Sequence, residues 1–547
     1  MFAEIVEKLT KFRYSSLSLP TGKLPGTGFR ILVIVLLLLG IFFRFYNLDR
    51  KAYWHDETFT SLRISGYTSK ELVQQVFNGR VIDSEDLQKY QRTNSEKSFS
   101  DTIKSLALED PQHPPLYYAI ARGWVQMFGN SVAVTRSLSA FISLLVFPCI
   151  YWLCWELFET PLVGWVAMAL VAVSPFQLIY AQEAREYILW AVTTLLSSAA
   201  LLRAVRLKNK RSWGIYAITF ALGLYTFLFT GLVAIGHGIY VFTMERFRFS
   251  KTTTSYLLAS LVAFVVFFPW IVILLKNFSQ FYKKTAWLAQ IDVPSWDMFK
   301  VWILQISYIF IDFEFSINRS LFKYLILPII LALLGASIYF ICHKTPKRIW
   351  LFILTLIGST AIPLIVPDLM YGGIRSVTHR YLIPYFLGIQ LAVAYFLATK
   401  LSSVSFSRRQ IWQTIVAVAI SSGILSCGFN VQAEMWWNKF FSNNFVKIAH
   451  ILNESKRPLF MTNLDPGVQN IGNMLSLSYL VQPKVRFQLF VEPNTPKIPV
   501  TVGDVFLYNP SKTLRTDAEQ QYKAKAQRVF QDKATNMVMW KLSKPKG

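Results

Sequence analysis

The stretch RILVIVLLLLGIFFRFY at residues 30–46 decides the fold, because it is an almost uninterrupted apolar run. A helix that crosses a membrane needs about 20 predominantly apolar residues. A basic segment with Lys8, Lys11 and Arg13 precedes the run, and no small-residue cleavage site follows it. We therefore predict an uncleaved first membrane span with the N-terminus in the cytoplasm.

Ten further apolar runs follow along the chain, at residues 131–155, 162–181, 186–204, 213–228, 229–245, 254–276, 322–342, 349–366, 381–399 and 410–430. Two more apolar pieces, 114–129 and 298–316, are short, and each could be a half-span, an interfacial helix or a full pass. The composition agrees, with 53% hydrophobic and 16% charged residues, against about 25% charged in an average soluble chain. The sequence thus predicts an α-helical polytopic membrane protein with about 11–13 transmembrane helices.

The charge distribution tests this topology. The net charge of +25 would suggest nucleic acid in a soluble protein, but much of it lies in short loops between the apolar runs. Positive loops orient a membrane protein and remain in the cytoplasm, so we expect no nucleic-acid partner but contact with membrane lipids. The predicted cytoplasmic loops with this charge are 203–211, 246–251, 344–348 and 400–409. The loop at 156–161 is an exception, since it carries Glu156 and Glu159.

Two large polar segments fall on the outer side in this topology. The first, residues 47–113, holds more carboxylates than any other segment. The second, residues 431–547, alternates short strand-like runs with helical patterns, which predicts a small extracytoplasmic α/β domain. Its expected strands are 458–462, 486–491, 504–508 and 537–542, and its expected helices are 467–481 and 516–530. We predict two domains, a transmembrane catalytic domain at 1–430 that includes the first outer loop, and this α/β domain.

The first candidate for chemistry is the pair Asp56–Glu57, which follows Tyr53-Trp54-His55 shortly after the first span. Adjacent carboxylates repel each other and raise one pKa. A carboxylate at the membrane surface can act as general base for a hydroxyl acceptor. The alternative interpretation is a solvated acidic pair with Trp54 as an interface anchor.

The second candidate is Glu109-Asp110-Pro111-Gln112-His113-Pro114-Pro115-Leu116-Tyr117-Tyr118. The prolines suit a helix start, where the missing N–H costs no hydrogen bond. His113 could orient a carboxylate or bind phosphate, and Tyr117 is a candidate for substrate binding beside it. A structural role for a histidine near a helix start is the alternative.

The third candidate is the turn after Ser174-Pro175-Phe176, where Tyr180-Ala181-Gln182-Glu183-Ala184-Arg185-Glu186-Tyr187 lies between two spans. Ionisable groups at membrane depth are costly and are candidates for function. Arg185 suits a phosphate or pyrophosphate through its planar fork of donors. A salt bridge of Arg185 with Glu183 or Glu186 is the alternative, and both roles can hold together.

The fourth candidate is Arg375-Ser376-Val377-Thr378-His379-Arg380-Tyr381, before the span at 381–399. Its cations are predicted outside, against the positive-inside trend, which suits an anionic head group at the surface. Ordinary loop solubility is the alternative. The sequence contains no zinc-type cluster, P-loop, GxGxxG, GxSxG or HExxH pattern.

Taken in order, these motifs resemble the GT-C superfamily. Trp54-His55-Asp56-Glu57, then His113-Pro114-Pro115-Leu116-Tyr117-Tyr118, then the motif at 174–185, and Arg380-Tyr381-Leu382-Ile383-Pro384 are similar to bacterial members of the protein O-mannosyltransferase-like family, which includes the aminoarabinose transferase acting on lipid A. The resemblance covers residues 30–400. It implies a GT-C fold in the plasma membrane with juxtamembrane helices in the first outer loop.

The resemblance also implies a reaction. The expected enzyme is an inverting hexosyl or pentosyl transferase that takes a sugar from polyprenyl phosphate to a hydroxyl acceptor. Asp56 resembles the family's catalytic acidic residue, with Glu57 its neighbour, while Arg185 and Arg380 match positions that face the donor phosphate. His113, Tyr117, Glu183, Arg375, His379 and Tyr381 are further expected substrate contacts. A divalent metal near Asp56 is a further expectation, because carboxylate oxygens suit one.

Two other classes of function are considered beside this one. A transporter or flippase of lipid-linked sugars would carry charges along mid-bilayer helices and inverted repeats, whereas the charges here gather at one predicted surface. A non-catalytic assembly protein would use residues 431–547 to bind a partner.

Overall fold

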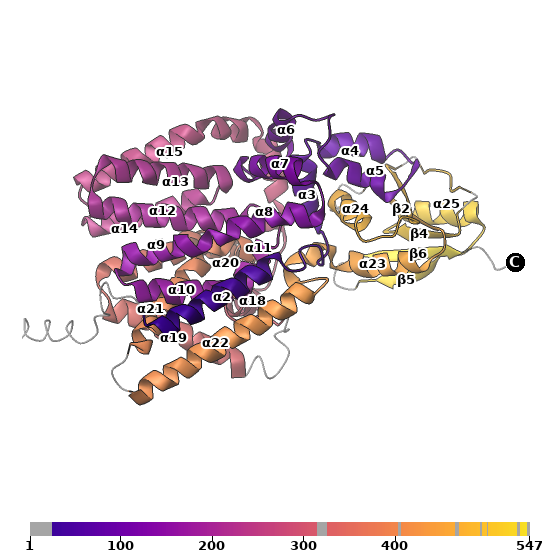
Figure 1. Cartoon of the computed structure of the whole chain (residues 1–547). Helices are drawn as coiled ribbons and strands as arrows, with labels where there is room; N and C mark the ends of the chain where they lie inside the picture. Colours follow the sequence, from indigo (N-terminus) through magenta and orange to yellow (C-terminus); the bar gives the residue numbers. More distant parts are fainter. Residues whose placement is uncertain are drawn as a thin grey trace, which may run out of the picture. The chain divides into compact units, whose positions relative to one another are not determined.

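The computed structural model describes residues 25–313, 325–402, 406–464, 470–492, 495–499, 502–532 and 537–543. The N-terminal basic residues Lys8, Lys11 and Arg13 lie outside this part. The chain forms two compact units (Figure 1). The first comprises residues 1–46, 111–116 and 139–432, and the second comprises 47–110, 117–138 and 433–547.

The first unit is a helical bundle. Its helices are α2 (Thr27–Phe45), α9 (Val146–Phe158), α10 (Pro161–Ala172), α11 (Pro175–Ala181), α12 (Tyr187–Leu207), α13 (Lys210–Thr226), α14 (Thr230–Met244), α15 (Lys251–Lys276), α16 (Phe278–Thr285), α17 (Trp287–Gln290), α18 (Ser295–Ser307), α19 (Leu327–Lys344), α20 (Lys347–Tyr371), η3 (His379–Leu382), α21 (Ile383–Leu401) and α22 (Phe406–Gln432). The division between the units falls inside α8 (Val132–Leu144).

Nine of the eleven predicted spans coincide with one helix each, whereas 131–155 corresponds to α8 and α9 and 162–181 to α10 and α11. Residues 322–324 of the predicted span 322–342 lie outside the described part. Within the described residues, eight helices are long and apolar enough to cross a membrane, and α10 with α11 adds a ninth that is bent by 65°. The remaining two predicted spans are shorter helices, α13 with 17 residues and α14 with 15. The two ambiguous pieces form α7 (Leu116–Phe128) and α18, with only 13 residues each. The chain is therefore a multi-span membrane protein, and α7 and α18 do not add spans by these criteria.

The bend between α10 and α11 follows from Pro175 at the start of α11, which cannot continue the hydrogen bonding of α10. The carbonyls left at the end of α10 need other donors. Buried Arg44 of α2 supplies them, since its guanidinium donates to the carbonyls of Ala172 (3.1 Å) and Val171 (3.2 Å). In return, Nε2 of Gln182 donates to the carbonyls at the end of α2. These bonds fix the ends of the segment that leads into residues 183–187.

The acidic loop that broke the charge pattern is neutralised by basic residues of the same unit. Glu156 accepts hydrogen bonds from Arg206, with a closest distance of 2.8 Å. Glu159 pairs with Arg348 at 2.9 Å. The exception at 156–161 therefore reflects ion pairing between neighbouring helix ends.

The second unit combines helices with one sheet. Its helices are α3 (His55–Ile64), α4 (Ser69–Val76), α5 (Ser84–Gln88), η1 (Lys89–Gln91), α6 (Phe99–Glu109), α7, η4 (Trp437–Ser442), α23 (Asn443–Glu454), α24 (Asn470–Ser478) and α25 (Lys512–Tyr522). Its strands are β1 (Val81–Ile82), β2 (Pro458–Asn463), β3 (Arg486–Phe490), β4 (Asp504–Tyr508), β5 (Gln527–Gln531) and β6 (Val538–Ser543).

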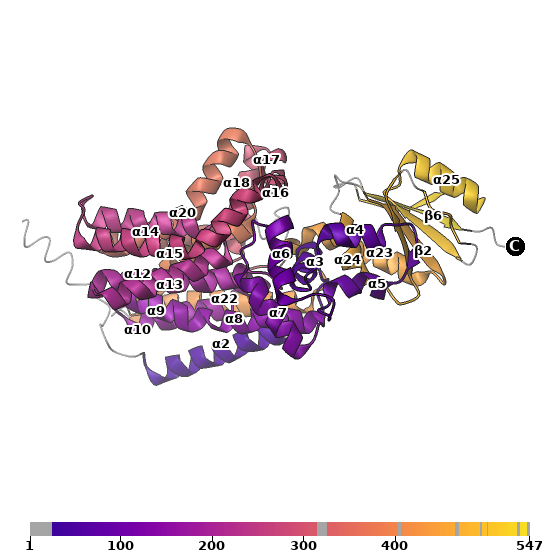
Figure 2. The ribbon, with the colours of Figure 1, turned by 90° about the horizontal axis from the view of Figure 1, so that it is seen from above.

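The sheet has the strand order β1-β3-β2-β4-β6-β5. Strand β2 runs parallel to β3 and β4, and the other pairs are antiparallel. Alternate residues point to opposite faces, so Phe460 and Phe506 pack in one core with α23 and α24, whereas Leu459 and Val505 pack in another with α25. Figure 2 shows α24 and α25 on opposite sides of the strands.

Two sequence predictions for this unit are corrected. The predicted helix at 516–530 ends at Tyr522 as α25, and strand β5 takes the residues from Gln527, because they pair with β6. The sequence analysis placed the first outer loop in the membrane domain. In the structure, residues 47–110 of this loop belong to the same unit as residues 433–547. Strand β1 of this loop pairs with β3, and Leu62 and Leu72 share a core with Phe460.

Candidate active site

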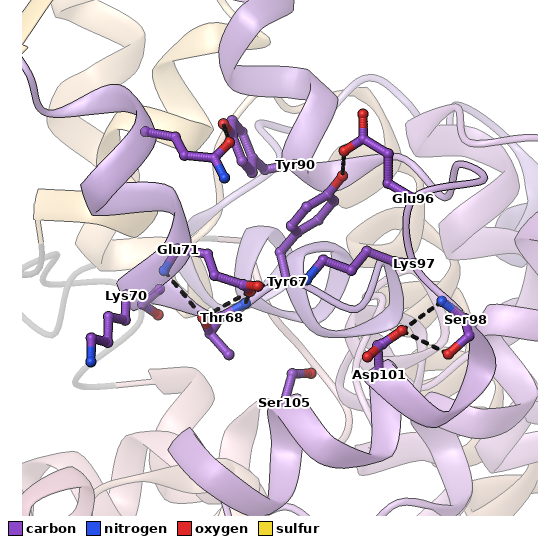
Figure 3. A network of polar contacts seen from close by, with 12 residues as sticks. Tyr67, Thr68, Lys70, Glu71, Tyr90, Glu96, Lys97, Ser98, Asp101 and Ser105 are labelled. Carbon is purple, nitrogen blue, oxygen red and sulfur yellow. Dashed lines mark hydrogen bonds and ion pairs between the residues drawn. The ribbon is translucent and has the colours of Figure 1, made fainter.

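Most carboxylates of the first outer loop serve local folding. Glu71 and Asp101 complete capping boxes at the starts of α4 and α6 (Figure 3). Tyr67 donates to Glu96 at 2.8 Å, and Lys97 bonds to Glu71 at 2.5 Å. Asp83 and Asp86 form a third capping box, and Glu109 and Asp110 pair with Arg63 at 2.8 and 2.6 Å. The abundance of acids in this loop is therefore not itself a sign of catalysis.

Asp56 and Glu57 lie in the first turn of α3, where the partial positive charge of the helix end favours carboxylates. The two side chains differ in their surroundings. Glu57 is fully buried, while Asp56 is half-buried. The α3 turn thus separates a buried carboxylate from one that is partly accessible.

Two cations hold Glu57 from other parts of the second unit. Arg136 binds both carboxylate oxygens, with Nη2 2.6 Å from Oε2 and Nε 2.7 Å from Oε1. Nζ of Lys439 donates to Oε2 at 2.7 Å. A buried carboxylate is stable only when it is paired in this way. The solvated-pair interpretation therefore does not describe Glu57.

Arg136 also shapes the chain just before Asp56. It donates to the backbone carbonyls of Leu48, Lys51 and Ala52 at 2.7–2.9 Å. The sequence analysis did not single out Arg136 or Lys439. Arg136 could have been selected from the sequence, because a charged residue near the start of the apolar run 131–155 is a candidate for function.

The first unit gathers His113, Arg185 and Glu186. Oε1 of Glu186 lies 2.7 Å from Nδ1 of His113 and 3.2 Å from Nη2 of Arg185. Nη2 of Arg185 also lies 3.3 Å from Nε2 of His113. The predicted salt bridge of Arg185 with Glu186 is present, and the predicted carboxylate contact of His113 is present as well.

Glu186 is fully buried, and its charge is maintained by its neighbours. A buried carboxylate needs a countercharge, and Arg185 provides one at 3.2 Å. Glu186 in turn orients the guanidinium group of Arg185.

Tyr187 connects Arg185 with the fourth motif. The guanidinium carbon of Arg185 lies 5.4 Å from the centre of its ring, and that of Arg380 lies 5.8 Å from the same ring. Both distances are within the range of a cation–π contact. The two predicted phosphate-binding arginines therefore meet on one aromatic side chain, which the sequence analysis had quoted in the motif but not selected.

The remaining predicted residues of the first unit surround this pair or stabilise nearby turns. His379 faces Tyr180 with ring centres 6.4 Å apart, and Tyr381 packs on Phe227 and Phe229. Glu183 is buried in the same segment as Arg185.

Arg375 has a different environment from Arg380. It pairs with Asp368 at 2.7 Å and donates to the carbonyl of Gly372, and Ser376 binds the same carboxylate. These contacts fix the turn before η3, so Arg375 acts in folding in this structure.

Tyr117 lies in the second unit and is fully buried against Tyr118, with ring centres 5.8 Å apart. Its packing explains its place in the motif without a substrate. The predicted role in substrate binding stays a prediction.

The divalent cation expected near Asp56 stays a prediction. No group of three or more His, Cys, Asp or Glu side chains that could hold a metal occurs in the part of the chain that the structure describes. Glu57 is bound by two cations.

Comparison with known proteins gives a family match and several structural similarities. Residues 112–273 match the family model described as dolichyl-phosphate-mannose-protein mannosyltransferase. No curated protein sequence matches the chain.

Three solved structures are similar. The oligosaccharyltransferase of Archaeoglobus fulgidus, tethered to an acceptor peptide, is 11% identical with a TM-score of 0.47, and the match covers 83% of this chain and 64% of that one. ArnT of Cupriavidus metallidurans bound to undecaprenyl phosphate is 12% identical with a TM-score of 0.48, covering 95% and 100%. The mycobacterial arabinofuranosyltransferase AftD is 13% identical with a TM-score of 0.47, covering 96% and 40%.

These identities and TM-scores are low, and the family match over residues 112–273 is the stronger similarity. The matched segment contains His113, Glu183 and Arg185, three of the residues predicted from the motifs. The match covers residues 112–273 only, so it shows that this segment is similar to the dolichyl-phosphate-mannose-protein mannosyltransferase family.

Proposed function

We propose that the chain transfers a sugar from a polyprenyl-phosphate donor to a hydroxyl group of a lipid, glycan or protein, with inversion at the anomeric carbon. The observation that carries this proposal is the pair of arginines on Tyr187, of which Arg185 is held by His113 and Glu186. A phosphate leaving group gains negative charge, and preorganised guanidinium groups stabilise such charge. The phosphate-linked lipids named for the family model and for ArnT agree with this choice of donor.

The proposed reaction is a single displacement. Asp56 accepts the proton of the acceptor hydroxyl as its oxygen bonds to the anomeric carbon. The bond from that carbon to the phosphate oxygen breaks, and the electron pair leaves with polyprenyl phosphate. Arg185 and Arg380 stabilise the charge on the departing phosphate. Glu57 keeps the α3 turn in place through Arg136 and Lys439.

The proposed location is the plasma membrane of a bacterium, with the N-terminus in the cytoplasm and the C-terminal α/β region outside. The basic loops between the spans support this orientation. The donor's isoprenoid tail would remain in the lipid while its head group reaches the outer surface.

A purified system tests the function. The protein in detergent is given a polyprenyl-phosphate sugar and a hydroxyl acceptor, and free polyprenyl phosphate is measured. Acceptor-dependent release supports the transferase, because no membrane is present across which a transporter could act. Donor that stays intact across a panel of sugars and acceptors, with protein that is folded, would contradict it.

A further inference from the structure

A small pocket opens at one end of the sheet in the second unit. It has a volume of about 260 Å³. Its lining residues are Val81, Lys456, Arg457, Pro458, Leu459, Lys484, Arg486, Pro499 and Val502. We refer to it as the strand-end pocket. Four of its nine lining residues are cations, and all four are exposed.

The register of the sheet explains why these residues meet. In the parallel pair of β2 and β3, Leu459 is the partner of Arg486. Arg457 directly precedes β2, and Lys484 lies two residues before β3, so the parallel pairing brings the two chain segments together at one end of the sheet. The cations therefore come from two chain segments that the fold joins at the start of parallel strands.

The charge of the pocket is only partly balanced. Arg486 pairs with Asp83 at 3.1 Å, and Lys484 donates to the carbonyl of Asn453 at 2.6 Å. Among the described residues, the four cations of the pocket form one ion pair, between Arg486 and Asp83. Like charges gathered around a concave surface raise the local positive potential, which attracts anions.

We propose that the strand-end pocket binds the phosphate group of a small phosphorylated molecule. Arginine offers paired donors that match phosphate oxygens, and lysine adds a compact point charge. Pro458, Leu459, Pro499 and Val502 supply apolar surface beside the cations. The volume lies just below the roughly 300–1,000 Å³ of drug-sized sites, so it suits a phosphate or a sugar phosphate. This site is separate from the proposed transfer chemistry and does not depend on it.

The test uses the full chain in detergent and titration calorimetry. The soluble probes are inorganic phosphate and glucose 6-phosphate, with glucose as the uncharged control. Both phosphates should bind, glucose should not, and binding should weaken as salt is raised. Equal binding of glucose and glucose 6-phosphate would overturn the proposal.

A pair of variants locates the binding. The side chains of Lys456 and Arg457 make no hydrogen bond or ion pair in the described structure, so Lys456→Gln with Arg457→Gln should fold normally. This double variant should bind glucose 6-phosphate about tenfold more weakly or worse. The control, Lys512→Gln with Lys525→Gln, removes the same charge from exposed positions outside the pocket. Equal weakening in both double variants would overturn the location.

A second arm distinguishes the source of the phosphate. Vesicles of phosphatidylcholine with and without phosphatidate are mixed with the protein and floated. Retention on phosphatidate vesicles that is lost in the pocket variant, with no binding of the soluble probes, supports the phosphate chemistry and assigns it to a lipid head group. Failure of the soluble probes and of phosphatidate vesicles alike would contradict the proposal.

Discussion

At the scale of single residues, the two carboxylates at the start of α3 lie in different surroundings. Glu57 is fully buried between Arg136 and Lys439, and this arrangement leaves it suited to positioning. Asp56 is half-buried one position earlier and remains the candidate general base. Neighbouring residues of the same chemical type are therefore distinguished by what holds them.

The variant Glu57→Gln tests the positioning role. It leaves two buried cations without their countercharge, which costs about 3–5 kcal/mol when a buried pair is broken. We expect a clearly lower midpoint of thermal unfolding for the purified protein, while Asp56→Asn unfolds near the wild-type temperature. Equal midpoints for Glu57→Gln and the wild type would contradict the role given to Glu57.

Arg185 is expected to act on the donor. Arg185→Ala should lower turnover about 10²–10³-fold, the usual cost of removing one donor that stabilises developing charge. Arg185→Lys should lose less, because the charge remains while the planar fork is lost. Kinetics at varied donor and acceptor check this, with donor use affected more than acceptor use. The reverse pattern would count against the assignment.

Much of this site could be predicted from the sequence because its motifs are local. His113, Arg185 and Arg380 lie in short polar stretches beside apolar runs. In the structure Arg185 lies close to His113, and it shares the ring of Tyr187 with Arg380. Arg136 and Lys439 could not be linked to Glu57, since they lie 79 and 382 residues away in the chain. Pairing over such separations depends on the fold.

At the scale of elements, close helix contacts depend on glycine in the first unit. A Cβ at Gly40 of α2 would lie 2.5 Å from the carbonyl oxygen of Ala172, and one at Gly423 of α22 would lie 2.5 Å from that of Val173. Both helices thus approach the end of α10 by backbone contact. Small residues permit such approach in membranes, where packing drives helix association.

One helix supplies both a test and its control for this packing. Gly423→Ala should lower the thermal unfolding midpoint in detergent, because the backbone of α10 cannot yield as a flexible side chain would. Gly428→Ala on the same helix should leave the midpoint unchanged or raise it slightly, since nothing lies within 4 Å of an added Cβ there. Equal midpoints for the two variants would show that α22 does not pack closely at Gly423.

The link between α3 and α6 should be sensitive to acid. Arg63 binds Glu109 and Asp110. Burial alone would raise the pKa of Glu109. Arg63 and the backbone N–H groups of Ser69 and Lys70 have a larger, opposite effect, so the pKa of Glu109 lies below its ordinary value of 4.5.

Because the folded state lowers the pKa of this carboxyl group, its ionised form stabilises the folded protein at pH values above the ordinary pKa. This stabilisation is lost as the pH falls through the pKa of the folded state. The unfolding midpoint of the wild type should therefore fall as the pH drops below about 4.5. Glu109→Gln should be less stable at neutral pH and should lose less on acidification. Parallel pH profiles for the two proteins would contradict this link.

The elements also show what sequence patterns determine. The apolar runs became helices because their length and composition permit little else in a membrane. Residues 527–530 were predicted as part of a helix but belong to β5, because pairing with β6 outweighed a weak local helical pattern. Helix α23 was not predicted, although its apolar side packs in the core with Phe460.

At the scale of the whole molecule, the first outer loop and the C-terminal region form one unit. Strand β1 has only two residues, too few to recognise from sequence, yet it pairs with β3 across some four hundred positions. The domain boundary at residue 430 followed from composition alone. The structure shows that residues 47–110 share a core with the α/β region instead.

The positions of the spans could be predicted at this scale, because hydropathy and length locate apolar helices. The orientation that the charge of the short loops favours stays a prediction. Ion pairs such as Glu156 with Arg206 explain the loop that did not follow the charge rule. The number of spans was less certain, since the short helices α13 and α14 and the broken pair α10–α11 depart from a simple length criterion.

Asp56 is the proposed general base of a transferase, and a comparison of the wild type with Asp56→Asn tests this role. Wild-type protein and Asp56→Asn are purified in detergent, shown to unfold at similar temperatures, and given the same polyprenyl-phosphate sugar and acceptor. We expect acceptor-dependent release of polyprenyl phosphate by the wild type and a loss of about 10²–10⁴-fold or more in the variant. Release by Asp56→Asn at the wild-type rate would contradict it.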